Sequence, residues 1–264
     1  MPELPPELER EILVELVFKA DRQNLNLKLT LCLVARRVQF WIDSIFYEVV
    51  SLTSQRSAVK FLTLVRSNEK PPGFFTVVKR LCLTVAVKAV TAFGILGVCT
   101  AVEALACWVD FYPEPDLPVL ISRLPLRRLS IEFHHFSRIP LNPSTWLSSL
   151  THLELFTWLA LSAPDLSRLA HLPCLTFVAV NNVHMSKELV AEVRTSCPRL
   201  QALVLLQRPN EIRRPYLRMA QNDPHIVVQE QSRNPVQDWE AAHFGYPDMW
   251  SRAEASMVAS LVGG

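Results

Sequence analysis

The side chains that could do chemistry in this chain lie at alternate positions of short apolar stretches. In "LTHLEL", residues 150–155, His152 and Glu154 alternate with leucines, and in a strand they would point away from them. Aromatic and arginine side chains on an open surface dominate the energy of protein interfaces. We therefore predict a surface that binds a protein substrate, and its candidate residues are Trp108, Arg128, Glu132, His152, Glu154 and Phe156. The alternative for Trp108 and Phe156 is that loops fold over them.

Motifs for catalysis are scarce. The chain has only 6 glycines and no phosphate-binding glycine loop, and neither G-x-S-x-G nor H-E-x-x-H occurs. His134 and His135 are adjacent, and neighbouring residues of a strand point to opposite faces. The six cysteines form no C-x-x-C pair and fit small core residues. The sequence thus predicts no enzyme, no cofactor and no metal site.

Composition limits the partners that we expect. Half of the 264 residues are apolar and 20% are charged, which is enough to bury a sizeable core. A net charge of +2 gives no broad attraction for nucleic acid. The N-terminus is too acidic for a signal peptide, and the longest uncharged apolar run, 89–102, is shorter than the roughly 20 residues of a membrane span. We predict an intracellular protein with no nucleic-acid or membrane partner.

An apolar motif of the form L-x-x-L-x-L recurs at a nearly constant interval. Its central residues are spaced 24, 24, 24, 25 and 25 positions apart, and they are Leu81, Leu105, Leu129, Leu153, Val178 and Leu203. Ile226 marks a weaker seventh unit. This period is typical of leucine-rich repeats, in which each unit supplies one strand and a returning helix or turn. The alternative is an ordinary α/β domain whose strands have irregular spacing.

The segments between the motifs change to helical spacing. In "SKELVAEVRTSC", Ser186 can cap a helix that carries Leu189, Val190, Val193 and Cys197 on one stripe. Cys99 and Cys197 each lie three residues before a strand motif, which resembles the cysteine-containing class of leucine-rich repeats. We predict an α/β fold: a solenoid over 48–230, with parallel strands on an open concave face and helices on the convex face.

The two ends have patterns of their own. Residues 231–264 are rich in aromatic residues, and after Pro247 a helix would carry an apolar stripe that could cover the last repeat as a cap. That stripe comprises Met249, Trp250, Ala253, Met257 and Val258. Residues 1–47 predict short amphipathic helices, which are too small to bury much apolar surface alone. This N-terminal segment must therefore pack on the repeats or on a partner.

The N-terminal pattern "LPPELEREIL … LCLVARRVQFWI" resembles an F-box. The matching residues are Leu4, Pro5, Leu8, Ile12, Leu31, Val34, Arg36 and Arg37. With the degenerate repeats that follow, the whole chain is similar to fungal F-box-like proteins that have a leucine-rich-repeat C-terminal domain.

The resemblance implies a substrate-recruiting adaptor of an SCF-type ubiquitin ligase. The N-terminal helices would bind the ligase's small adaptor subunit, and the concave face would hold a protein substrate. The expected ligase-binding residues are Leu4, Pro5, Leu8, Ile12, Leu16, Leu31, Val34 and Trp41. The alternative is a non-catalytic interaction scaffold in which the same helices only cap the solenoid.

Overall fold

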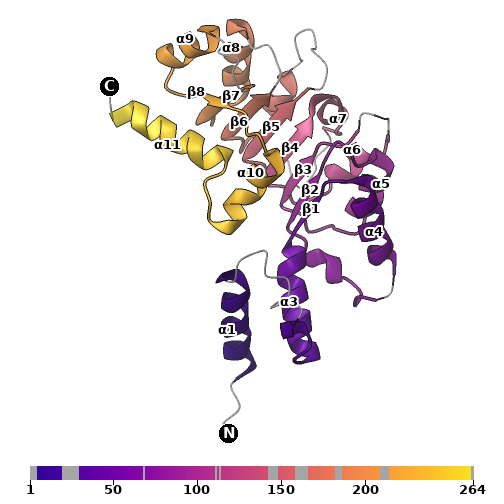
Figure 1. The fold of residues 1–264 in the computed structure, drawn as a ribbon. Coiled ribbons are helices and arrows are strands. Elements are labelled where there is room, and N and C mark those ends of the chain that lie inside the picture. Colours follow the sequence, from indigo (N-terminus) through magenta and orange to yellow (C-terminus); the bar gives the residue numbers. More distant parts are fainter. Residues whose placement is uncertain are drawn as a thin grey trace.

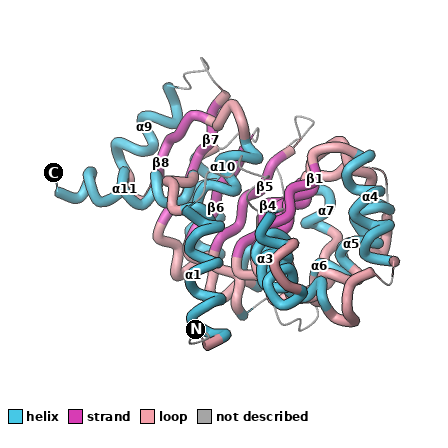
Figure 2. The backbone as a smooth tube through the Cα atoms, turned by 60° about the horizontal axis from the view of Figure 1, so that its bottom comes forward, coloured by secondary structure: helices cyan, strands magenta, loops and turns pink. Residues whose placement is uncertain are grey.

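The computed structural model describes residues 5–19, 30–67, 69–110, 112, 114–141, 148–157, 166–181, 186–208 and 214–262. The chain is an α/β protein whose eight parallel strands lie side by side in sequence order (Figures 1 and 2). The strands β1 to β8 are Val49–Leu52, Arg80–Leu83, Ala104–Cys107, Arg128–Glu132, His152–Phe156, Phe177–Asn181, Ala202–Gln207 and Ile226–Glu230. Strands β1 and β8 form the two edges, so the sheet is open.

The strand register confirms the interval found in the sequence. The central residues of successive motifs are direct partners on neighbouring strands, from Leu81 opposite Leu105 to Leu203 opposite Ile226. They form one row of side chains that are at most 6% exposed. The first strand was not predicted, because β1 continues directly from a helix and lies 31 residues before the next unit, with Val50 opposite Leu81.

Helices cover one face of the sheet, which we call the helix side. They share one apolar core with Leu81, Leu105 and the other members of that row. In chain order they are α4 (Gln55–Arg66), η1 (Phe74–Val77), α5 (Ala89–Leu96), α6 (Leu117–Ile121), α7 (Phe133–Ser137), η3 (Ser167–His171), α8 (Lys187–Ser196) and α9 (Arg214–Asn222). The predicted cap of α8 is confirmed, since the Ser186 side chain accepts a hydrogen bond from the Leu189 amide.

The opposite face carries the alternate side chains of the strands, and residues 235–262 lie across it; we call these residues the C-terminal segment. It consists of α10 (Pro235–Ala241), η4 (Ala242–Phe244) and α11 (Met249–Val262), drawn in yellow in Figure 1. His243 in η4 lies 3.9 Å from Glu48, next to β1, whereas α11 packs on β7 and β8. The segment therefore crosses the sheet and returns.

This arrangement corrects the prediction of a cap on the last repeat. Met249, Trp250, Ala253 and Met257 do form an apolar stripe, but they pack on side chains of β6, β7 and β8 that were expected to face water. Val258 is 60% exposed and does not belong to the stripe. A cap on the last repeat would cover only the edge strand β8. The C-terminal segment instead packs on side chains of several strands on one face of the sheet.

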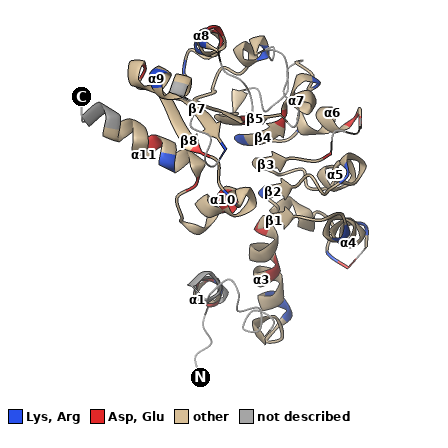
Figure 3. Cartoon of the chain, turned by 45° about the horizontal axis from the view of Figure 1, so that its top comes forward, with Lys and Arg blue, Asp and Glu red and all other residues tan. Residues whose placement is uncertain are grey.

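At the other end of the chain, α1 (Pro6–Lys19) packs on α3 (Arg36–Glu48), and α3 continues directly into β1. Figures 1 and 3 both show α1 beside α3 and away from the sheet. Arg37 of α3 donates two hydrogen bonds to the Glu9 carboxylate of α1, at 3.0 and 3.2 Å. In the part of the chain that the structure describes, no helix has the length and apolar character needed to cross a bilayer.

Candidate functional site

The two aromatic residues predicted as exposed anchors are buried. Trp108 is 9% exposed and Phe156 is 6% exposed, and their rings meet edge to face at 6.4 Å. Val236 and Trp239 of α10 pack against them. Of the two alternatives for these rings, the covered one holds, and apolar side chains of the C-terminal segment cover this face of the sheet.

Glu132 is also buried, and its contacts are structural. Its carboxylate accepts hydrogen bonds from the His134 amide at 2.6 Å and the His135 amide at 3.3 Å, which caps the N-terminus of α7. The two histidines thus lie on a short helix rather than at the end of a strand. The His135 ring contacts the Asp110 carbonyl oxygen at 3.0 Å.

His152 lies within an aromatic cluster under the start of α11. Its ring stacks on Phe177 with centroids 4.7 Å apart and meets Trp250 edge to face at 5.1 Å. Burial, followed by repulsion from the nearby Arg128 guanidinium, lowers the pKa of His152 to about 4, against the opposing charge of Asp248. At neutral pH this imidazole is therefore uncharged.

A cavity of about 270 Å³ lies between the sheet and the C-terminal segment. Its lining includes four of the predicted substrate-binding residues, namely Trp108, Arg128, Glu154 and Phe156. Glu132 and His152 are not part of it. The structure thus brings most of the predicted residues together, in a partly open pocket between the sheet and the C-terminal segment.

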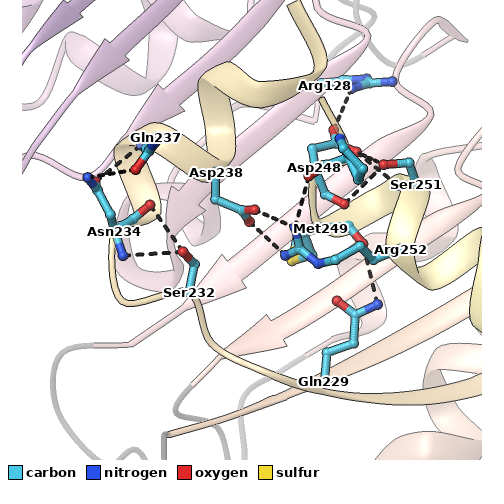
Figure 4. A network of polar contacts seen from close by, with 11 residues as sticks. Arg128, Gln229, Ser232, Asn234, Gln237, Asp238, Asp248, Met249, Ser251 and Arg252 are labelled. Atoms are coloured by element: carbon cyan, nitrogen blue, oxygen red, sulfur yellow. Dashed lines mark hydrogen bonds and ion pairs between the residues drawn. The ribbon is translucent and has the colours of Figure 1, made fainter. Parts of the chain in front are cut away.

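Two ion pairs hold the C-terminal side of this cavity (Figure 4). Arg128 of β4 pairs with Asp248 at 3.1 Å, and Arg252 of α11 pairs with Asp238 of α10 at 2.6 and 3.1 Å. Asp248 also accepts a hydrogen bond from the Ser251 amide at 2.8 Å at the start of α11. Arg128 therefore joins the sheet to the C-terminal segment.

Glu154 of β5 and Glu230 of β8 are acidic groups on the sheet side of the cavity, and Glu154 belongs to a chain of hydrogen bonds. The Trp108 indole N–H donates to the Ser130 hydroxyl oxygen at 2.6 Å, and that hydroxyl donates to the Glu154 carboxylate at 2.6 Å. Burial raises the pKa of Glu154, the hydrogen bond from Ser130 opposes this, and Asp238 raises the pKa further.

Several cavity residues were missed among the sequence candidates. Arg80 of β2 lines the cavity, and burial followed by repulsion from Arg128 lowers the pKa of its guanidinium. The alternation of side chains along the strand could have identified Arg80 as a residue on the same face as Arg128. Further missed residues come from the strands, among them Ser130, Asn181 and Glu230, and from the C-terminal segment, among them Asp238, Trp239, Asp248, Trp250 and Arg252.

The predicted ligase-binding residues fall into an exposed and a packed group. Leu8 and Ile12 of α1 are 48% and 47% exposed, Val34 is 65% exposed, and Pro5 is exposed as well. Leu31 and Trp41 are partly buried against a small core of Val38 and Ile42. Leu4 and the side chain of Leu16 lie outside the described residues.

Helix α3 packs through two aromatic side chains on the short helix η1, which precedes β2. Tyr47 meets Phe74 at 5.4 Å and Phe75 at 6.0 Å, both edge to face, and Phe40 meets Phe74 at 6.0 Å. Helix α3 thus belongs structurally to the sheet region, whereas α1 is attached to it through α3.

Comparison of the chain with protein-family models, with curated proteins and with solved structures gives no match.

Proposed function

We propose that this protein is a substrate-recruiting adaptor of an SCF-type ubiquitin ligase, built as an F-box-like helical segment on a leucine-rich-repeat solenoid. The sequence pattern of the N-terminal helices and the 24–25-residue interval of the strands support this proposal. The strand order and register agree with such repeats, since each strand pairs with the next one along the chain.

The observation that carries the ligase-binding role is the open apolar face of α1. Leu8 and Ile12 lie four residues apart, so they project from the same side of the helix, and each is about half exposed. A helix that only capped the solenoid would turn this face onto the first strands. In the described structure, α1 instead packs on α3, which leaves the face available for the ligase subunit.

The packing of α3 favours the scaffold alternative for that one helix. Tyr47 and Phe40 contact the phenylalanines of η1, so α3 covers the first unit of the sheet whether or not a ligase binds. The two roles are compatible, because α1 carries the exposed leucine and isoleucine and α3 carries the capping contacts.

The substrate would enter the cavity under the C-terminal segment rather than lie on an open concave sheet. Arg128, Glu154 and the aromatic residues that were predicted to bind substrate line this cavity. Chemistry on the substrate would belong to other subunits of the ligase.

The experiment is a calorimetric titration of the purified SCF adaptor subunit into the wild-type chain and into the double variant Leu8→Asp with Ile12→Asp. Wild type should bind, and the variant should bind at least about 100-fold more weakly, because burying an unpaired carboxylate costs several kcal/mol. The matched control is Val59→Asp with Val90→Asp, on α4 and α5, where the valines are 45% and 60% exposed. It should bind like wild type. A wild-type chain that does not bind the subunit would refute the proposal.

A further inference from the structure

Glu154 lies in a part of the sheet where its neighbours are small. Its strand partners are Ser130 on β4 and Ala179 on β6, and Ala106 lies opposite Ser130 on β3. Ser130 and Glu154 line the cavity, whereas Ala106 and Ala179 are covered by apolar side chains of the C-terminal segment. Glu154 is thus the one long side chain in a row of short ones.

The Glu154 carboxylate is held by hydrogen bonds from neutral side chains. Ser130 donates to it at 2.6 Å, and the Asn181 side chain adds a second hydrogen bond. Among the described residues, no lysine, arginine or histidine forms an ion pair with it. Glu154 is partly buried, and partial removal of a carboxylate from water without a cation costs free energy, so such groups in clefts are candidates for functional sites.

The walls of the cavity are suited to a positive charge. Four aromatic residues line it: Trp108 and Phe156 from the sheet, and Trp239 and Trp250 from the C-terminal segment. The faces of aromatic rings attract ammonium and guanidinium groups, and Trp does so most strongly. A carboxylate beside aromatic walls therefore selects an organic cation.

The other charged groups that line the cavity are four arginines and three acidic residues. Arg128 is paired with Asp248 and Arg252 with Asp238, and no arginine contributes to the pKa shift of Glu154. The remaining charged side chains in the lining are Arg80, Arg208 and Glu230.

We propose that this cavity binds the basic side chain of a peptide, the ammonium of a lysine or the guanidinium of an arginine, with Glu154 as its counter-ion. A volume of about 270 Å³ is small for a ligand site, and it accommodates one long side chain rather than a folded domain. The inference rests on the proposed function in that the peptide would belong to the ligase substrate.

The test uses four capped amino acids as probes: the N-acetyl N-methylamides of lysine, arginine, norleucine and glutamate. Binding is followed by tryptophan emission, since Trp108, Trp239 and Trp250 line the cavity. At least one basic probe should give a saturable change, with an affinity about tenfold or more above that of norleucine, because a charged hydrogen bond is lost with the neutral probe. Its affinity should increase as pH rises and Glu154 ionises.

The key variant is Glu154→Gln, which keeps an acceptor for Ser130 and removes the charge. It should weaken the basic probe about tenfold or more. Its melting temperature at neutral pH should be equal to or above that of wild type, since it removes an uncompensated carboxylate. Glu192→Gln on α8 is the control with the same charge change, and it should bind like wild type.

Three results would overturn the inference. They are no saturable binding of either basic probe, binding of norleucine or glutamate as tight as that of the basic probes, and unchanged binding by Glu154→Gln. A lower melting temperature with unchanged binding would assign Glu154 a structural role only. Because α1 is remote from this cavity, Glu154→Gln should still bind the SCF adaptor subunit, so failure here is distinct from failure of the proposed function.

Discussion

The two ends of the chain are both helical and amphipathic, yet one buries its apolar face and the other exposes it. In the C-terminal segment, Met249, Trp250 and Ala253 are at most 9% exposed and pack on the sheet. In α1, Leu8 and Ile12 remain about half exposed. The comparison teaches that helical spacing identifies an apolar face but does not identify what covers it. We infer a folding role for the C-terminal face, and the docking role of the N-terminal face is our proposal.

We expect the largest loss of stability from a substitution in the C-terminal segment. Trp250→Ala should lower the free energy of unfolding by about 3–5 kcal/mol, because it removes a buried indole that packs on Phe177 and His152. Chemical denaturation measures this directly. A variant as stable as wild type would mean that the segment lies on the sheet without stabilising it.

A pH dependence follows from His152, which lies under the same segment. Its pKa in the folded chain, about 4, is below the ordinary value of 6.5. Between these values the unfolded chain binds a proton that the folded chain excludes, so stability falls as pH falls through this window, by at most about 3 kcal/mol.

His152→Phe keeps an aromatic ring beside Phe177 and removes this titration. Glu154, whose pKa is raised, makes stability rise as pH falls, and it does so in wild type and in His152→Phe alike. The difference in pH dependence of stability between the two proteins therefore reports on His152. Equal losses of stability in the two proteins between pH 6.5 and 4 would contradict a buried neutral imidazole.

A smaller effect is expected from Asp248, which caps α11 and pairs with Arg128. Asp248→Ala should cost about 1–2 kcal/mol, since a capping hydrogen bond and a partly buried ion pair are both lost. Glu103→Ala is the control, because its pairs with Lys79 and Arg127 are exposed and should contribute about 0.5 kcal/mol or less. Equal losses in the two variants would show that Asp248 does not hold the segment in place.

The smallest effect on stability is expected at the N-terminus. Leu8→Asp with Ile12→Asp should change the free energy of unfolding by about 1 kcal/mol or less, since substitutions at exposed positions usually have small effects. A large loss would indicate that these residues pack on the rest of the protein, as the scaffold alternative requires.

The strands could be predicted from the sequence because their geometry is local and repeated. A strand alternates its side chains with a period of two, and an interval of 24–25 residues brings Leu129 beside Leu153 without further information. Strand β1 was missed because Val49–Leu52 directly follows α3 and so lacks the preceding part of the motif, and because it lies 31 residues before the next unit instead of 24 or 25.

The covering of the second face could not be predicted in the same way. Trp239 and Trp250 lie far along the chain from Trp108 and Phe177, and their apolar pattern is equally compatible with an end cap. The role of Glu132 was missed because its carboxylate caps a helix that the strand pattern did not predict. The strand pattern thus identified four residues that line the cavity, namely Trp108, Arg128, Glu154 and Phe156. Their burial depends on contacts with residues far along the chain, which the local pattern does not contain.

The most direct test of the central claim is hydrogen–deuterium exchange on the full chain, with and without the purified SCF adaptor subunit. The account predicts that binding slows exchange of amides in α1, while amides of α10 and α11 exchange as in the free protein. Protection in the C-terminal segment without protection in α1, or no change anywhere at saturating subunit, would contradict the assignment of the open N-terminal face as the docking surface.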